Sequence, residues 1–242
     1  MKISVIISYY QRKDNCLRVV KALESQTDRD FEIVVADDGS DVPIKEHLPE
    51  GVIYCRQKHL FYSPGRTRNF GASHATGDMY LFLDQDCVPG KEVVKNIKQI
   101  FNNVDYRPLV LAGYIENYAK SPKDPRTPFG IWDNHGALTR SWGHISGGIF
   151  CIDSDSFWKS GGCEGRELKS YDDVIFGFRL IKAVPDIKIM FCDNVRCFHL
   201  DHPMDSQRSS YEGQFKEFIK AYYTELYQTH YPKESDNAKT TN

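Results

Sequence analysis

The N-terminal part of the chain alternates short apolar runs with segments whose apolar residues recur at helical spacing. The apolar runs are rich in β-branched residues and predict buried strands, at residues 3–8, 31–36, 52–55 and 78–83. The amphipathic segments predict helices, at residues 14–25, 65–75 and 89–101. Strands that alternate with helices are typical of an α/β fold, a Rossmann-like three-layer α/β/α sandwich around a mostly parallel sheet.

The second half of the chain is less regular. Residues 118–143 carry several prolines with little periodicity and predict a long irregular loop. The remaining pattern predicts strands at residues 145–152, 187–191 and 195–198, and helices at residues 154–159, 172–184 and 211–227. The chain shows neither an internal repeat nor a clear linker, so we expect one domain over residues 1–232 and a polar, disordered tail at 233–242.

Acidic residues stand at the carboxyl ends of two predicted strands. Asp37 and Asp38 follow the second strand, and Asp84 and Asp86 end the fourth. Ligands of open α/β sheets bind beyond these strand ends, so we expect the four acids to converge on one crevice. Residues i and i+2 of an extended chain project to the same side, and two carboxylates held so close favour a cation between them. Oxygen ligands suit Mg²⁺ or Mn²⁺, although such a pair alone is weak evidence because acidic pairs often only decorate turns.

Composition argues against several classes of protein, among them nucleic-acid-binding and membrane-spanning proteins. The net charge of −2 over 242 residues argues against a nucleic-acid partner held by a strong basic field. The seven cysteines are scattered, and Cys192 and Cys197 lack a zinc-site spacing, so buried thiols in a reducing cytoplasm are expected. The sequence has no apolar run near the ~20 residues that span a bilayer, and its opening lacks signal-peptide features. We therefore expect a cytoplasmic protein with at most peripheral contact at the cytoplasmic membrane face.

Four segments resemble, in order, the motifs of family 2 glycosyltransferases with the GT-A fold. They are Ile-Ile-Ser-Tyr-Tyr-Gln-Arg at residues 6–12, Val-Val-Ala-Asp-Asp-Gly-Ser at 34–40, the Gly-Arg-Thr-Arg-Asn segment with its continuation at 65–78, and Phe-Leu-Asp-Gln-Asp at 82–86. More loosely, residues 145–162 and 172–180 resemble the acceptor-side segments of that family and a galactosyltransferase-type C-terminal region. The resemblance implies a nucleotide-sugar-binding half at residues 1–104 and an irregular acceptor-binding half at 105–232.

The chain also departs from the family pattern. Ser8 and Gln11 stand where Pro and Asn are usual, and Asp172 and Ile175 replace the usual acids of the E-D-x-D-L-x-x-R stretch. These departures bear more heavily on the acceptor side than on the donor side.

The resemblance implies a donor site for a UDP-sugar with Mn²⁺ or Mg²⁺. Asp86 is then a direct metal ligand, and Asp84, which also belongs to the expected metal site, faces the ribose or a metal-bound water. Asp38 is expected to accept the imide N–H of uracil. The remaining expected donor-site roles are bracing of the loop or ribose by Asp37, a cation near the phosphates or base from Arg68, and backbone contact to the base from Ser8. Against these roles stand an Asx turn before Gly39 and a helix surface charge at residue 68.

The acceptor side is expected to hold the general base. Asp173 is the candidate that takes the acceptor proton during inverting transfer, with Asp172 beside it as a substrate-binding residue. Both acids also suit a helix N-terminus. The resemblance implies that a histidine completes the metal site, and His199 is preferred to His202 because it directly follows a predicted strand. Candidate pocket-lining residues are Trp142, His144, Gly147 and Gly148, and a tryptophan beside glycines is equally often core.

These features favour a metal-dependent inverting glycosyltransferase. It would move a hexose or N-acetylhexosamine from a UDP-sugar to a glycan or lipid-linked acceptor during polysaccharide or glycoconjugate biosynthesis. One alternative is a nucleotidyltransferase, which the lack of a glycine-rich basic loop after the first strand disfavours. Another is a catalytically inactive carbohydrate-binding module, against which the retained acids weigh. The first strand is not followed by G-x-G-x-x-G, which argues against a dinucleotide-binding dehydrogenase.

Overall fold

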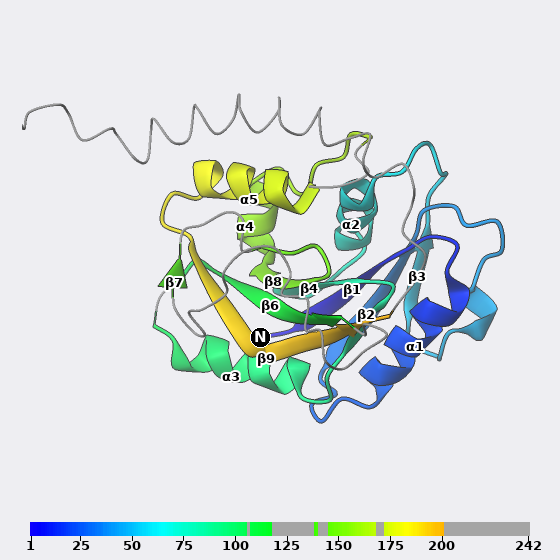
Figure 1. The fold of residues 1–242 in the computed structure, drawn as a ribbon, viewed down its shortest axis with the longest axis horizontal. Helices are drawn as coiled ribbons and strands as arrows, with labels where there is room; N and C mark the ends of the chain where they lie inside the picture. Colours follow the sequence, from blue (N-terminus) through cyan, green and yellow to red (C-terminus); the bar gives the residue numbers. More distant parts are fainter. Residues whose placement is uncertain (106, 118–137, 140–144, 168–171, 201–242) are drawn as a thin grey trace, which may run out of the picture. The chain divides into compact units, whose positions relative to one another are not determined.

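A nine-stranded mixed sheet organises the part of the chain that the structure, a computed structural model, describes (Figure 1). The described residues are 1–105, 107–117, 138–139, 145–167 and 172–200. The strand order is β3-β2-β1-β4-β8-β6-β9-β5, and β7 pairs with β9. The strands are β1 (Ile3–Tyr9), β2 (Phe31–Asp37), β3 (Ile53–Arg56), β4 (Met79–Asp84), β5 (Cys87–Pro89), β6 (Leu109–Asn117), β7 (Leu138–Thr139), β8 (Ile149–Asp153) and β9 (Lys188–His199).

The N-terminal strands form the parallel part of the sheet. β1 pairs in parallel with β2 and β4, and β2 pairs in parallel with β3. β8 then enters antiparallel between β4 and β6, β6 runs parallel to β9, and β5 and β7 run antiparallel to β9. In parallel strands the carboxyl ends lie at one edge, so the acids after β2 and β4 emerge on the same side of the sheet.

Helices cover both faces of the sheet, as the sequence predicted (Figure 1). α1 (Lys13–Glu24) and α3 (Val93–Asn103) pack on one face through apolar side chains that include Val20 and Ile97. α2 (Pro64–Ala72), α4 (Ser154–Lys159) and α5 (Asp172–Ala183) lie on the other, where Phe157 and Phe176 join Ile6 of β1. A short 3₁₀ helix, η1 (Lys45–His47), lies between β2 and β3. Successive side chains of β1 point to opposite faces of the sheet, so β1 contributes buried residues to the core on both faces.

The turn after β2 and the start of α2 follow from local sequence signals. Gly39 has φ +78°, a left-handed conformation that favours glycine, and the Ser40 N–H donates to Asp37 Oδ1 at 2.8 Å. Ser63 caps α2 by accepting from the Arg66 N–H, and Pro64 occupies the first helical turn. The turn at Gly39 sets the position of the acids that follow β2, and the Ser63 cap sets where α2 and its arginines begin.

The structure corrects several predicted boundaries. The expected helix at residues 89–101 begins at Val93, after the short strand β5, and the expected strand at 145–152 begins at Ile149. The two strands expected at 187–191 and 195–198 are one strand, β9, whose register against β6 shifts between Gly113 and Tyr114. β6 was not predicted, and β7 lies inside the segment that was expected to be a loop.

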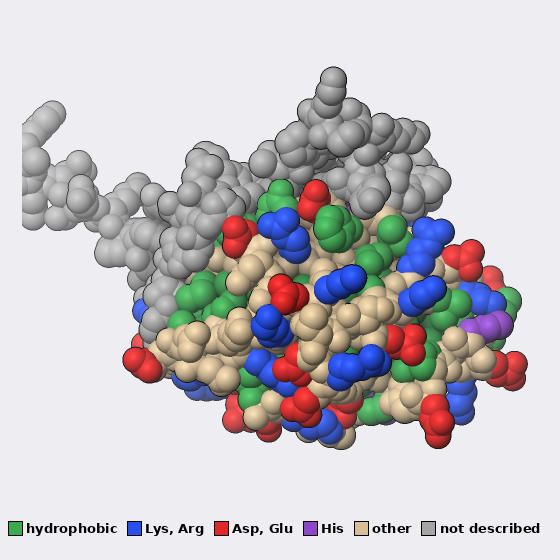
Figure 2. Space-filling view, turned by 90° about the horizontal axis from the view of Figure 1, so that it is seen from below, with side chains coloured by type: hydrophobic (Ala, Val, Ile, Leu, Met, Phe, Trp, Pro, Cys, Tyr) green, Lys and Arg blue, Asp and Glu red, His purple; other side chains and the backbone are tan. Residues whose placement is uncertain are grey.

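The chain divides into two compact units, Met1–Pro203 and Met204–Asn242, and the whole second unit lies outside the described residues. The predicted helix at 211–227, the predicted tail at 233–242, and the candidates Trp142, His144 and His202 also lie outside them. Within the described ranges, no helix has both the length and the apolar character needed to cross a bilayer. Figure 2 shows Lys and Arg interspersed with Asp and Glu on the face seen from below Figure 1.

Candidate active site

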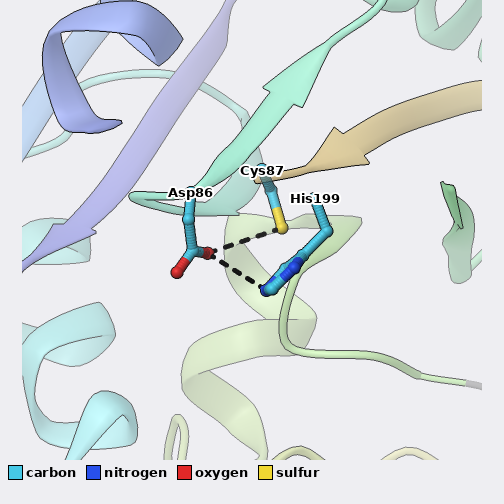
Figure 3. A group of neighbouring side chains, drawn as sticks. All are labelled: Asp86, Cys87 and His199. Carbon is cyan, nitrogen blue, oxygen red and sulfur yellow. Dashed lines mark hydrogen bonds and ion pairs between the residues drawn. The ribbon is translucent and has the colours of Figure 1, made fainter. Parts of the chain in front are cut away.

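Asp86 and His199 come together where β5 pairs with the end of β9 (Figure 3). Asp86 Oδ1 lies 3.6 Å from His199 Nε2, and a ligand atom of Cys87 completes a group whose members all lie within 4.8 Å of one another. Cys87 and His199 are directly paired residues of the β5–β9 ladder. The ladder thus brings together two candidate metal ligands that are far apart in the sequence.

The chemistry of this group fits a hard divalent cation. A carboxylate oxygen and an imidazole nitrogen both suit Mn²⁺, and a cation with two protein ligands has positions left for phosphate and water. A hydrogen bond with Cys197, together with burial, raises the pKa of the Cys87 thiol well above its usual range. Sulfur is also a soft ligand, so Cys87 suits a hard cation less well than Asp86 and His199 do.

Asp84 takes part in a different arrangement, centred on the buried guanidinium of Arg68. Arg68 Nη2 donates to Asp84 Oδ1 at 2.7 Å and to the Gly147 carbonyl at 3.0 Å, and Arg68 Nη1 donates to Asp172 Oδ2. The Ser8 hydroxyl also donates to Asp84 Oδ1, at 3.1 Å. Arg68 is only 2% exposed, so its charge is committed to these internal partners.

Burial and charge act in opposite directions on this pair. Burial raises the pKa of the Asp172 carboxyl, Asp173 and Asp84 add to the rise, and the Arg68 guanidinium opposes it. Burial would lower the pKa of Arg68, but Asp172 and Asp84 raise it well above its ordinary value. Arg68 therefore keeps its charge and supplies the counter-charge that a buried acid needs.

Asp173 lies at the start of α5, next to Asp172. Its Oδ2 accepts the Gly147 N–H at 2.9 Å, and its Oδ1 accepts the Val174 N–H at 2.8 Å. A Cβ at Gly147 would come within 2.5 Å of Arg68 Nη2, so glycine permits this close approach. Gly147 therefore links the candidate base to the guanidinium: its N–H donates to Asp173, and its carbonyl accepts from Arg68.

The acids after β2 have separate environments. Asp37 is fully buried and braces the turn, since it accepts from the Ser40 N–H and the Tyr54 hydroxyl and lies 3.7 Å from Arg56 Nε. Asp38 is 3% exposed and accepts from Gln57 Nε2 at 2.7 Å, from Arg66, and from His59 Nδ1 at 2.8 Å.

An aromatic surface adjoins Asp38. The His59 ring stacks on Tyr10, with ring centroids 4.4 Å apart and an interplanar angle of 13°. A flat base can stack on such a surface.

Sequence reasoning missed the residues that hold the loop after β1. Arg12 Nη1 donates to Asp86 Oδ2 at 2.9 Å, and the Tyr10 N–H donates to Gln85 Oε1 at 2.9 Å. Arg12 and Gln85 both lie inside segments that the sequence singled out, and their side-chain type was the available signal. Their partners depend on contacts between residues more than seventy positions apart, which no local pattern encodes.

The predicted site residues thus form three connected groups among the described residues. Asp86 and His199 form the candidate metal group, while Asp37 and Asp38 belong to the turn after β2. The third group surrounds Arg68 and contains Ser8, Asp84, Gly147, Asp172 and Asp173. Gly148 joins it through its carbonyl, which accepts the Asp84 N–H at 3.3 Å.

Comparisons with known proteins agree on a family. Residues 4–161 match the model of the family described as Glycosyl transferase family 2. An uncharacterized glycosyltransferase of Haemophilus influenzae is 29% identical over 191 residues, covering 74% of this chain and 62% of that protein. A GalNAc(5)-diNAcBac-PP-undecaprenol beta-1,3-glucosyltransferase of Campylobacter jejuni is 28% identical over 91 residues, covering 35% of this chain and 29% of that protein. The chain therefore spans less than two thirds of the length of both relatives.

The fold is also similar to a solved structure. The crystal structure of Staphylococcus aureus TarS residues 1–349 in complex with UDP-GlcNAc superimposes with a TM-score of 0.74 at 19% identity. The match covers 94% of this chain and 67% of that one. At this identity the likeness establishes a shared fold.

Proposed function

The chain belongs to glycosyl transferase family 2, and we propose that it transfers a hexose or N-acetylhexosamine from a UDP-sugar with the help of Mn²⁺ or Mg²⁺. The acceptor would be a glycan or a lipid-linked glycan, and the transfer would invert the anomeric centre. The observation that carries this proposal is the pairing of Asp86 with His199 at the strand end that also presents Asp84 to Arg68.

Each group would have one role in this reaction. Asp86 and His199 would hold the cation, which supplies stabilisation of the departing diphosphate when it is bound. Asp38, with the stacked rings of Tyr10 and His59, would receive the uracil base. Asp84, fixed by Arg68 and Ser8, would face the ribose or a metal-bound water.

Asp173 would act on the acceptor. Its carboxylate would take the proton of the acceptor hydroxyl as that oxygen forms a bond to the anomeric carbon and the bond from that carbon to UDP breaks. Two backbone N–H groups hold the Asp173 carboxylate in place, from Gly147 and Val174. Asp172, held by Arg68, would keep the start of α5 at the crevice. Residues 1–104 would supply the donor half and 105–232 the acceptor half.

Named relatives support the choice of substrates without extending to this chain directly. The structural neighbour was crystallised with UDP-GlcNAc, which favours a UDP-sugar donor. The name of the C. jejuni relative contains a polyprenyl-diphosphate-linked acceptor, which favours a lipid-linked glycan.

Calorimetric titration with UDP, with and without Mn²⁺, tests the donor site. We expect binding that needs Mn²⁺, that weakens at least about tenfold in Asp86→Asn because a charged ligand is lost, and that is weaker for GDP. Asp186→Asn, in an exposed turn between α5 and β9, is the matched control and should bind as the wild type does. Absence of UDP binding by the wild-type chain in both conditions would contradict the proposal.

A further inference from the structure

A permanent cation lies directly against the candidate metal ligand. Arg12 Nη1 donates to Asp86 Oδ2 at 2.9 Å, whereas Asp86 Oδ1 is the oxygen near His199 Nε2, at 3.6 Å. Figure 3 shows one carboxylate oxygen joined to both His199 and Cys87, while the other points away from them. The two oxygens of Asp86 therefore engage different partners on different sides.

We propose that Arg12 is a second cation of the donor site, which makes metal binding conditional on the diphosphate. Before the donor arrives, Arg12 is the counter-ion of Asp86. When metal and nucleotide bind, its guanidinium takes up part of the diphosphate charge. This inference rests on the proposed function, because it assigns to Arg12 a role toward the same donor.

The charges of the described group support this assignment. The Asp86 side chain is only 8% exposed, so its carboxylate needs a counter-ion, and the guanidinium of Arg12 supplies one while no metal is bound. A divalent cation at Oδ1 would share the carboxylate charge of Asp86 with Arg12. Like charges that share one carboxylate repel, which weakens metal binding to the free protein. A nucleoside diphosphate brings several negative charges and would relieve this repulsion.

The exposure of Arg12 suits a change of partner. Its side chain is 39% exposed, in contrast to the 3% of Arg68, so it can turn toward a ligand without leaving a buried cavity. Guanidinium groups also bind phosphate oxygens through paired N–H donors. Of these two cations, Arg12 is the more exposed and Arg68 the more buried.

The backbone around Arg12 is strained and tightly held. Gln11 has φ +63°, a left-handed conformation that a residue with a Cβ rarely adopts. The Gln11 N–H donates to Ser40 Oγ at 2.9 Å, and the Tyr10 N–H donates to Gln85 Oε1. These bonds hold the loop in place. On either side of Gln11, Tyr10 stacks on His59 and Arg12 donates to Asp86. The strained turn therefore links the candidate base pocket to the candidate metal group.

Two titrations of the full chain test the inference. The first measures Mn²⁺ binding without nucleotide by the electron paramagnetic resonance signal of free Mn²⁺, and the second measures UDP binding by calorimetry at saturating Mn²⁺. In Arg12→Met we expect Mn²⁺ alone to bind roughly 3- to 10-fold more tightly, because a competing charge is removed. UDP should bind at least about 10-fold more weakly, because a phosphate contact is lost.

Controls separate this role from a structural one. Arg12→Lys keeps the charge and should bind Mn²⁺ alone as the wild type does, and Arg18→Met, at an exposed position of α1, should change neither titration. Arg12→Gln is measured in parallel as a second neutral variant, with urea unfolding to verify that each variant is folded. Neutral variants that bind Mn²⁺ alone no more tightly than the wild type would overturn the inference. Failure of wild-type UDP binding would instead reject the proposed function and leave the Mn²⁺ comparison readable.

Discussion

At the scale of single residues, Arg68 is a buried guanidinium that is hydrogen-bonded to several internal acceptors of the candidate site. The sequence suggested a cation near the phosphates or base, whereas the structure shows both Nη groups bound to internal acceptors from three segments. A buried guanidinium with these partners is a positioning group for Asp84 and Asp172. The role of Arg68 near the phosphates or base stays a prediction, beside the diphosphate contact that we propose for Arg12.

Removal of the Arg68 charge should destabilise the chain. In Arg68→Met the buried carboxylate of Asp172 loses its counter-ion, and breaking a buried pair from one side costs about 3–5 kcal/mol. We therefore expect the free energy of unfolding, measured with urea near neutral pH, to fall by about 3 kcal/mol. Arg29→Met, at an exposed loop position, is the control and should change it by less than about 0.5 kcal/mol. A loss below about 1 kcal/mol in Arg68→Met would show that the ion pair is not a stabilising element.

The sequence predicts which acidic residues belong to the candidate site, but it does not predict which side chains pair with them. Asp37, Asp38, Asp84 and Asp86 were placed because strand ends in an α/β sheet collect ligands. The partners of these acids, among them Arg66 and Gln85, come from segments distant in sequence. Periodicity reports which face a residue occupies, and it carries no information about which distant side chain meets it.

At the scale of elements, one partly buried carboxylate holds together the edge where β1, β2 and β4 begin. Glu32 of β2 accepts from Ser4 of β1 at 2.6 Å and from the backbone and hydroxyl of Thr76, just before β4, and pairs with Lys2 at 2.8 Å. Burial alone would raise its pKa, but the hydrogen bonds from Lys2, Ser4 and Thr76 lower it to about 2. The ionised form is therefore bound more tightly in the folded chain than in the unfolded chain.

Replacement of Glu32 should produce a pH-dependent loss of stability. Because the folded pKa lies below the unfolded value of about 4.3, the stabilisation is present above that pH and is lost as the pH falls toward about 2. We expect Glu32→Gln to lower the free energy of unfolding by about 2 kcal/mol near pH 7, with a smaller difference near pH 3. Urea unfolding across this range measures it, with the exposed Glu24→Gln as control. A difference that stays constant with pH would contradict the assigned role of the charge.

Elements with local signals were predicted well, and those defined by sheet pairing were not. The parallel strands β1 to β4 and helices on both faces were confirmed, because each carries its own apolar run or amphipathic stripe. β9 looked like two strands because the exposed Asp193 and Asn194 interrupt its apolar run, where the register against β6 shifts. Such a bulge is set by the partner strand and leaves little trace in the sequence.

At the scale of the whole molecule, the site gathers residues from many parts of the described fold. The candidate metal group comes from the β4–β5 connection and β9, Arg68 comes from α2, and Asp173 comes from α5. A ligand that needs several of these elements at once can bind only the folded chain. Binding must then shift the folding equilibrium by mass action.

Thermal unfolding with UDP and Mn²⁺ can therefore distinguish the donor side from the acceptor side. At about 100 times the dissociation constant a ligand adds about 2.7 kcal/mol, and we expect a midpoint increase of roughly 5–10 °C for a chain of this size. Asp86→Asn should abolish the increase, because a ligand of the cation is lost. Asp173→Asn should keep the increase and yet lose transferase activity, because a general base acts on the acceptor and not on UDP. Loss of the increase in Asp173→Asn would place Asp173 in the donor site and refute its assignment as the base.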